Sequence, residues 1–191
     1  MAVNKQNIVI EGSSGKFGNN LVFRQRDGVT ILSKNPVMRE DYVPTEDQVN
    51  QRFVFMEAVW YAKSAIANPE LKAEYKAKAK PNQSAYNVAF KDFTTAPILH
   101  KVNYSLYAGA IGDTLTCRIT DLMAVVTVKV SLYDTDGVLI EEGMAVQSDL
   151  KLDWVYTATV AHTPVLGTRI VVTMTDTPAN VYMREVVIGV G

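Results

Sequence analysis

The side chains best suited to binding a ligand lie in a basic stretch near the N-terminus. Four basic residues alternate there with apolar ones, and we name these four, with the aromatic residue beside the first of them, the ribbon residues: Lys16, Phe17, Arg24, Arg26 and Lys34. Cations bind phosphates and aromatic rings stack on bases, so this combination is typical of nucleic-acid contacts. Nearby acidic residues dilute the charge, and contact with a protein partner is an equally open use of the same residues.

A glycine-rich loop precedes the first ribbon residue. Gly12 to Lys16 invites comparison with a phosphate-binding loop, but its glycines are too closely spaced and Phe17 leaves no hydroxyl for magnesium. Gly15 and Gly18 have the spacing of the clamp that holds single-stranded RNA, yet that clamp joins two helices. A turn that only glycine permits is the favoured interpretation.

An acidic motif further along the chain has the spacing with which calcium loops begin. Asp134 and Asp136 are two residues apart and Gly137 follows, but no third ligand occupies the next alternate position. The pattern therefore favours a plain hairpin turn.

The remaining reactive residue types are isolated. His100 and His162 lack companions at metal-ligand or catalytic spacing. Cys117 is the only cysteine and alternates with apolar neighbours, so we expect a buried small hydrophobe rather than a thiolate or a disulfide. The sequence thus predicts no catalytic residue, no metal site and no cofactor.

Three aromatic residues near the C-terminus could stack on a sugar ring: Trp154, Tyr156 and Tyr182. Strand alternation places Trp154 and Tyr156 on the same face as Leu152, which indicates core packing instead.

Composition and charge narrow the class of protein. The 191 residues are 48% hydrophobic and 20% charged, with a net charge of −1, so no general attraction to nucleic acid or membranes is expected. Residues 1–101 hold 14 basic and 10 acidic side chains, whereas residues 102–191 hold 5 and 10. We find no signal peptide and no membrane-spanning run, which predicts a cytoplasmic protein and leaves extracellular or particle-associated locations open.

Helical signals occupy the middle of the chain. Thr45 with Gln48 forms a capping box at the start of a long helix that runs to about Ala67. Its apolar residues Val49, Phe53, Met56, Trp60 and Ala67 fall on one line, which predicts a buried face. Shorter helices are expected over residues 70–80 and 84–93.

Strand signals occupy both ends. We expect a strand over residues 7–11 and a hairpin around Asp27 and Gly28, before the long helix. After Pro97 the hydrophobic period changes to two, with strands near 99–107, 113–120, 124–134, 137–146, 150–160, 166–175 and 180–190. The predicted fold is α+β: a β-ribbon and helices over residues 1–96, then a seven-stranded antiparallel sandwich of immunoglobulin or fibronectin type over residues 97–191.

The N-terminal third resembles a group of uncharacterised bacterial proteins of Bacteroidetes type. The matching positions are Gly15, Gly18, Gly28, Thr45, Gln48, Arg52 and Phe55. The resemblance implies a C-terminal immunoglobulin-like domain and supplies no established activity, no cofactor and no site residues.

These observations favour a non-enzymatic structural or protein-interaction module, in a phage-like or cell-associated assembly. A ribbon too small to bury itself needs a surface to cover, and the edges of a sandwich accept partner strands. Self-association or a protein partner is therefore expected, and no membrane partner. Nucleic-acid binding by the ribbon residues is the alternative, and carbohydrate binding a further one.

Overall fold

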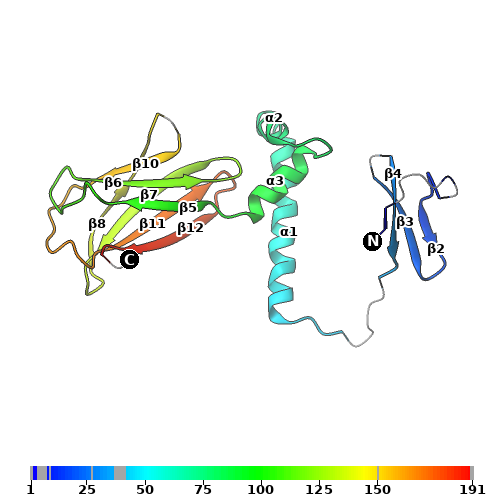
Figure 1. Cartoon of the computed structure of the whole chain (residues 1–191), viewed down its shortest axis with the longest axis horizontal. Helices are drawn as coiled ribbons and strands as arrows, with labels where there is room; N and C mark the ends of the chain where they lie inside the picture. Colours follow the sequence, from blue (N-terminus) through cyan, green and yellow to red (C-terminus); the bar gives the residue numbers. More distant parts are fainter. Residues whose placement is uncertain are drawn as a thin grey trace. The chain divides into compact units, whose positions relative to one another are not determined.

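The structure is a computed structural model that describes residues 2–3, 8, 10–26, 28–36, 42–149 and 151–189. The chain divides into two compact units, residues 1–51 and 52–191 (Figure 1). The described residues form three helices and three four-stranded antiparallel sheets, which confirms a mixed α+β fold. The predicted domain boundary at residues 96 and 97 falls inside the second unit, between its helices and its strands, and stays a prediction.

The first unit holds one sheet, in the order β1-β4-β3-β2. Its strands are β1 (Ala2–Val3), β2 (Gly15–Phe17), β3 (Leu21–Arg26) and β4 (Val29–Lys34). The predicted hairpin joins β3 to β4, where Arg26 pairs with Val29. Gly28 has a φ of +76°, which glycine adopts at no steric cost. Asp27 lies outside the described residues.

The predicted strand at residues 7–11 is wrong where the structure describes it. Ile8, Ile10 and Glu11 lie in turns, and Ile8 is 85% exposed. Asn7 and Val9 lie outside the described residues. The short strand β1 pairs with β4 instead, and two residues are too few to show a period in the sequence.

The three helices begin and end near their predicted bounds: α1 (Glu46–Ala67), α2 (Pro69–Lys78) and α3 (Ala85–Thr94). The capping box forms, because Thr45 N donates to Gln48 Oε1 at 3.0 Å and Gln48 N donates to Thr45 Oγ1 at 3.4 Å. Ser84 caps α3 by accepting from Asn87 N at 3.2 Å. Local capping chemistry therefore sets the helix starts.

The helices of the second unit share a core. Ala62 and Ala65 of α1 are buried in one cluster with Tyr75 of α2 and Val88 and Ala89 of α3. Two rings of α1 also contact rings of α3: the centroids of Tyr61 and Phe93 are 5.5 Å apart, and those of Phe55 and Phe90 are 5.0 Å apart. The small side chains of Ala62 and Ala65 leave room in this core for Tyr75 and for the partly buried Phe90.

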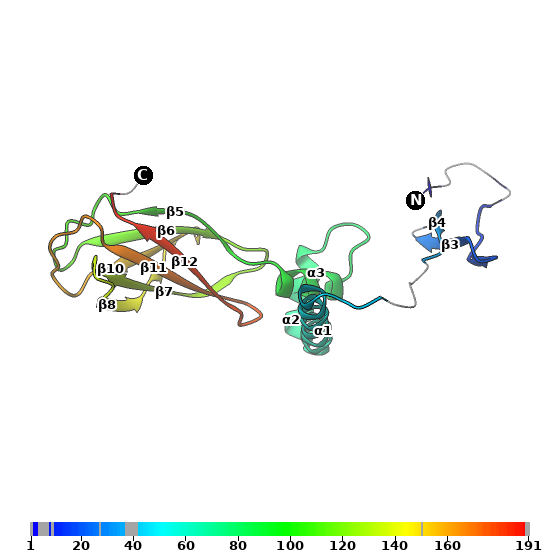
Figure 2. The same cartoon turned by 90° about the horizontal axis from the view of Figure 1, so that it is seen from below.

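The rest of the second unit is formed by two sheets, and α3 leads directly into the first of their strands (Figure 2). Their strands are β5 (Ile98–Asn103), β6 (Thr114–Thr120), β7 (Val125–Tyr133), β8 (Leu139–Met144), β9 (Val146–Gln147), β10 (Asp153–Thr157), β11 (Arg169–Asp176) and β12 (Val181–Val187). The sheet orders are β5-β6-β10-β9 and β12-β11-β7-β8.

One hydrophobic core lies between the two sheets. It includes Leu115 and Trp154 of the first sheet with Val130 and Ile170 of the second, all at most 6% exposed. The alternation of buried and half-buried residues along β11 is the pattern expected of a half-buried strand. The described residues form eight strands here, so the seven-stranded immunoglobulin arrangement is not confirmed; β9 has only two residues and leaves no periodic signal.

Candidate interaction surfaces

Three of the ribbon residues share one face of the first unit's sheet. Side chains alternate between faces along a strand, and paired residues on neighbouring strands share a face. Arg24 and Arg26 are two apart on β3, and Lys16 pairs with Val22, two residues before Arg24. The three cations are exposed and lie on the same face as Val22 and Ile31.

Phe17 and Lys34 lie on the opposite face. Both pair with Leu21, which precedes Val22 by one residue and therefore lies on the other face of the sheet. Phe17 is 71% exposed and its ring meets that of Phe23 edge to face, with 6.4 Å between centroids. The structure therefore brings together three of the five predicted residues and separates them from the other two.

The long helix α1 has two apolar faces. Ala58, Ala62 and Ala65 are buried, at 0%, 0% and 3% exposure. An α-helix turns by about 100° per residue, so Phe53 and Trp60 point almost directly away from these alanines. Phe53 is 55% exposed and Trp60 is 60% exposed.

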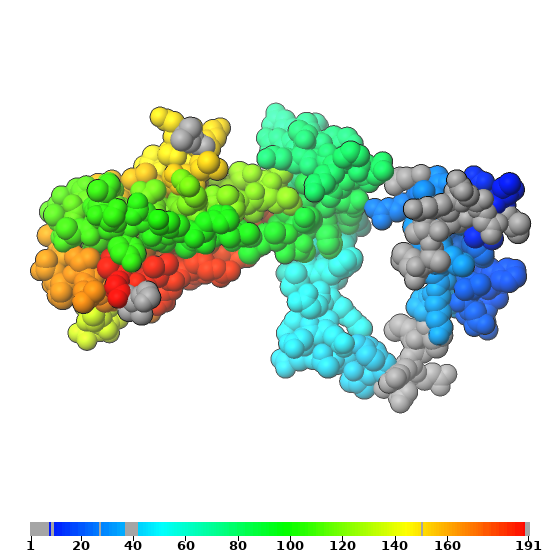
Figure 3. Space-filling view, in the orientation of Figure 1, coloured from blue at the N-terminus to red at the C-terminus, as the bar shows by residue number. Residues whose placement is uncertain are grey.

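Met56, which is 38% exposed, lies between Phe53 and Trp60 on the same side. We name Phe53, Met56 and Trp60 the aromatic face of α1. Figure 3 shows the first turns of α1, in cyan, without cover from the other helices or the strands of the second unit. The predicted burial of this stripe is wrong, because the second unit packs on the alanine side.

Three carboxyl groups influence one another's ionisation where α3 adjoins the sandwich, and we name them the carboxyl cluster: Asp92, Asp121 and Asp176. Asp92 and Asp176 are each 1% exposed. Burial, followed by the charges of Asp121 and Asp176, raises the pKa of Asp92 to about 6. Burial is also the main cause that raises the pKa of Asp121 and of Asp176.

Hydrogen bonds connect the carboxyl cluster to its surroundings. Tyr75 Oη donates to Asp92 Oδ2 at 2.8 Å, and the hydroxyls of Tyr61 and Tyr75 are 2.7 Å apart. Asn180 Nδ2 donates to Asp176 Oδ2 and to the carbonyl oxygen of Phe93, each at 3.1 Å. The cluster thus joins α1, α2 and α3 to the loop between β11 and β12.

Sequence reasoning did not find the carboxyl cluster, although one signal for it was present. Asp92 follows Ala85 and Val88 at helical spacing, so an acid falls on the buried face of α3. Asp92 Oδ1 and both carboxylate oxygens of Asp121 are buried, with the backbone of Met123 near the first carboxyl group and that of Leu122 near the second. In the described part of the chain, no three metal-binding side chains are grouped so that they could hold an ion. Asp92 and Asp176 are too buried to meet a substrate.

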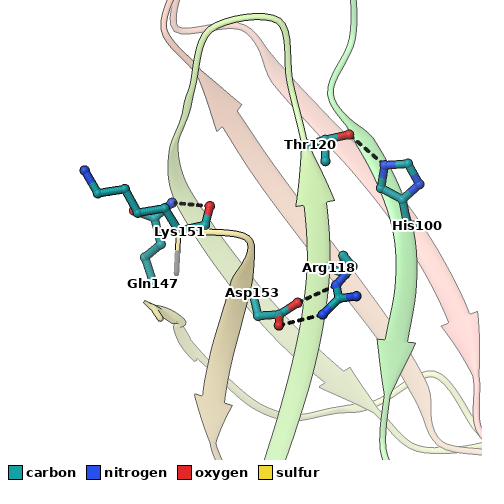
Figure 4. Close-up of polar contacts among 6 residues, drawn as sticks. All are labelled: His100, Arg118, Thr120, Gln147, Lys151 and Asp153. Carbon is teal, nitrogen blue, oxygen red and sulfur yellow. Dashed lines mark hydrogen bonds and ion pairs between the residues drawn. The ribbon is translucent and has the colours of Figure 1, made fainter. Parts of the chain in front are cut away.

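The outer face of the first sandwich sheet carries isolated polar pairs (Figure 4). Arg118 and Asp153 form a two-pronged ion pair at 2.8 and 2.9 Å, across β6 and β10. His100 Nε2 lies 2.6 Å from Thr120 Oγ1. Exposed pairs of this kind contribute little stability and form no reactive arrangement.

The residues considered for calcium or sugar binding have structural roles instead. Asp134 Oδ1 accepts from the amides of Asp136 and Val138, at 2.9 and 2.8 Å, as in a hairpin turn. Trp154 and Tyr156 are 6% and 3% exposed, so neither offers a face for a sugar ring.

Cys117 is buried with 0% exposure, as expected of a small hydrophobe. No helix in the described ranges is long and apolar enough to cross a membrane.

Comparisons with known proteins place the chain in no family. No family model matches it, and no curated protein matches it. Among solved structures it is similar to CopC from Methylosinus trichosporium OB3b, with 14% sequence identity and a TM-score of 0.36. That likeness covers 47% of this chain and 88% of the other. The resemblance to uncharacterised Bacteroidetes-type proteins stays a prediction.

Proposed function

We propose that this chain is a non-enzymatic protein-interaction module and that the aromatic face of α1 binds its partner. One observation carries the proposal: three large apolar side chains are exposed together on the side of α1 that faces away from its own core. The three expose roughly 300 Å² of side-chain surface, given that an aromatic residue can bury roughly 150–250 Å². Patches of this size on a folded chain commonly mark binding sites.

An exposed apolar run within α1 strengthens this proposal. Four consecutive apolar residues, 53 to 56, are each at least 38% exposed, so this part of the helix is apolar on more than one side. Such a run is unfavourable in water unless a partner covers it. Helical turns that pack against nothing are only marginally stable. A partner bound here would therefore also stabilise this part of the helix.

Photo-crosslinking in the native host tests the proposal. A photoreactive phenylalanine analogue at position 56 should give a covalent adduct with any protein that covers the aromatic face. The same analogue at Lys72, which is exposed on α2, is the matched control. Absence of an adduct at position 56, or equal adducts at both positions, would contradict the proposal.

Nucleic-acid binding is the second candidate, and the shared face of Lys16, Arg24 and Arg26 favours it. Three phosphate contacts predict that the logarithm of affinity falls with the logarithm of salt at a slope of about −3. Replacing Arg24 and Arg26 by glutamate should abolish this binding, whereas Lys34→Glu on the opposite face should leave most of it. A flat response to salt, or equal effects of both changes, would remove this candidate.

We further propose an immunoglobulin-like strand order for the sandwich that follows the three helices. Lettered along the chain, β5-β6-β10-β9 corresponds to strands A, B, E and D, and β12-β11-β7-β8 to G, F, C and C′. The strand order supports this assignment. An experimental structure with another connection between the sheets would contradict it.

A further inference from the structure

We infer that the partner on the aromatic face of α1 is a second copy of this chain, bound with the two helices side by side and parallel. This inference rests on the proposed function and names the partner. Spacing, area and charge on α1 each support it.

The spacing on α1 is that of paired helices. Phe53, Met56 and Trp60 follow one another by three and four residues, the alternation that lines the seam of a two-helix coiled coil. A seam of this kind is self-complementary, because the same residues of each copy meet across the axis. Lys63 occupies the next position of the pattern, so the apolar seam ends after Trp60.

The exposed area suits a weak and reversible pair. The three side chains expose roughly 300 Å² in each copy, so two copies would bury roughly 600 Å² through them alone. Specific interfaces usually bury roughly 1,200–2,000 Å², and weaker ones fall below that range. An interface of this size gives weak association. The average molecular mass in solution should therefore rise with protein concentration.

The charges beside the seam select the parallel orientation. Arg52 lies on one flank of the aromatic face and Glu57 on the other, five residues later. In a parallel pair, opposite flanks of the two helices meet with this offset, so Arg52 of each copy faces Glu57 of the other. In an antiparallel pair, equal flanks meet and bring like charges together.

Charge reversal tests both the partner and the orientation. Arg52→Glu and Glu57→Arg change exposed residues that have no charged neighbour three or four positions away on α1, so both variants should fold. Each alone turns two attractive contacts into two repulsive ones and should weaken self-association at least about tenfold. A mixture of the two variants should associate again, because both contacts become attractive.

The assay is sedimentation or light scattering of the purified full chain over a concentration series. The molecular mass of the parent chain should rise from that of a monomer to that of a dimer. It should stay that of a monomer when Phe53, Met56 and Trp60 are all replaced by glutamine. Val181 and Met183, exposed apolar residues of β12 at 59% and 63%, provide a matched glutamine control that should still pair.

Three outcomes would overturn the inference: a single copy at every concentration, pairing that survives the triple glutamine change, or no recovery when the charge-reversed variants are mixed. The proposed function fails separately. If the purified chain is a single copy but position 56 crosslinks to a different protein in the host, this inference is wrong and the proposed function stands.

Discussion

Replacing Asp92 by asparagine should stabilise this protein at neutral pH. Asp92 is 1% exposed, and burial and nearby carboxylates raise its pKa from 3.8 to about 6. A carboxyl group with a raised pKa is charged at pH 7 at a cost to the folded state. The difference between the two pKa values corresponds to about 3 kcal/mol.

The sign of the pH dependence follows from proton binding. Between pH 4 and pH 6 the folded state holds a proton on Asp92 that the unfolded state has already released. Stability from this group is therefore full below pH 3.8 and is lost as the pH rises through about 6. In the Asp92→Asn variant this side chain carries no charge at any pH, and its amide oxygen can still accept from Tyr75. We expect a gain of about 2 kcal/mol at pH 7, after allowing for the weaker hydrogen bond to a neutral acceptor.

Urea unfolding of both proteins from pH 4 to pH 8, followed by circular dichroism, measures the effect. Groups whose pKa is lowered, such as Asp113 and Asp153, give an opposite dependence near pH 4. The difference in unfolding free energy between Asp92→Asn and the parent at each pH cancels that background. Asp136→Asn, at an exposed aspartate, is the control and should change the unfolding free energy at pH 7 by less than about 0.5 kcal/mol. A variant that is less stable than the parent at pH 7, or a difference that does not grow between pH 4 and pH 7, would refute the reasoning.

Three further changes have clear expected outcomes. Tyr75→Phe removes the hydroxyl that donates to Asp92 and should cost about 2 kcal/mol in urea unfolding, so an unchanged midpoint would contradict this hydrogen bond. Gly109→Ala should cost about 3 kcal/mol or more, because φ is +89° and the added carbon would overlap the carbonyl oxygen of His162; a thermal melt close to that of the parent would show that this loop can shift. Burial raises the pKa of the Cys117 thiol to about 11 and leaves it 0% exposed, so a maleimide should label it only after unfolding, and labelling of the native protein in mass spectrometry would disprove that burial.

Local chemistry explains why the helices and most strands were predictable. The reciprocal bonds of Thr45 and Gln48, and the cap from Ser84, use only residues within four positions of each other. Strand pairing around Gly28 likewise follows from a tight turn. Helical spacing could show that Asp92 is buried but not what surrounds it, because Asp121 lies in the loop after β6 and Asp176 ends β11, and only the tertiary fold brings these segments to α3.

The aromatic face of α1 shows what periodicity leaves open. A period of 3.6 residues identifies faces of a helix but does not say which of two apolar faces the chain itself covers. The alanines at positions 58, 62 and 65 lie opposite Phe53 and Trp60, and large rings from α2 and α3 take the alanine side. A small side chain gains little from burial alone, so size-ranked hydrophobicity points to the wrong face. The larger residues then stay exposed. Their burial against a partner would supply free energy for binding.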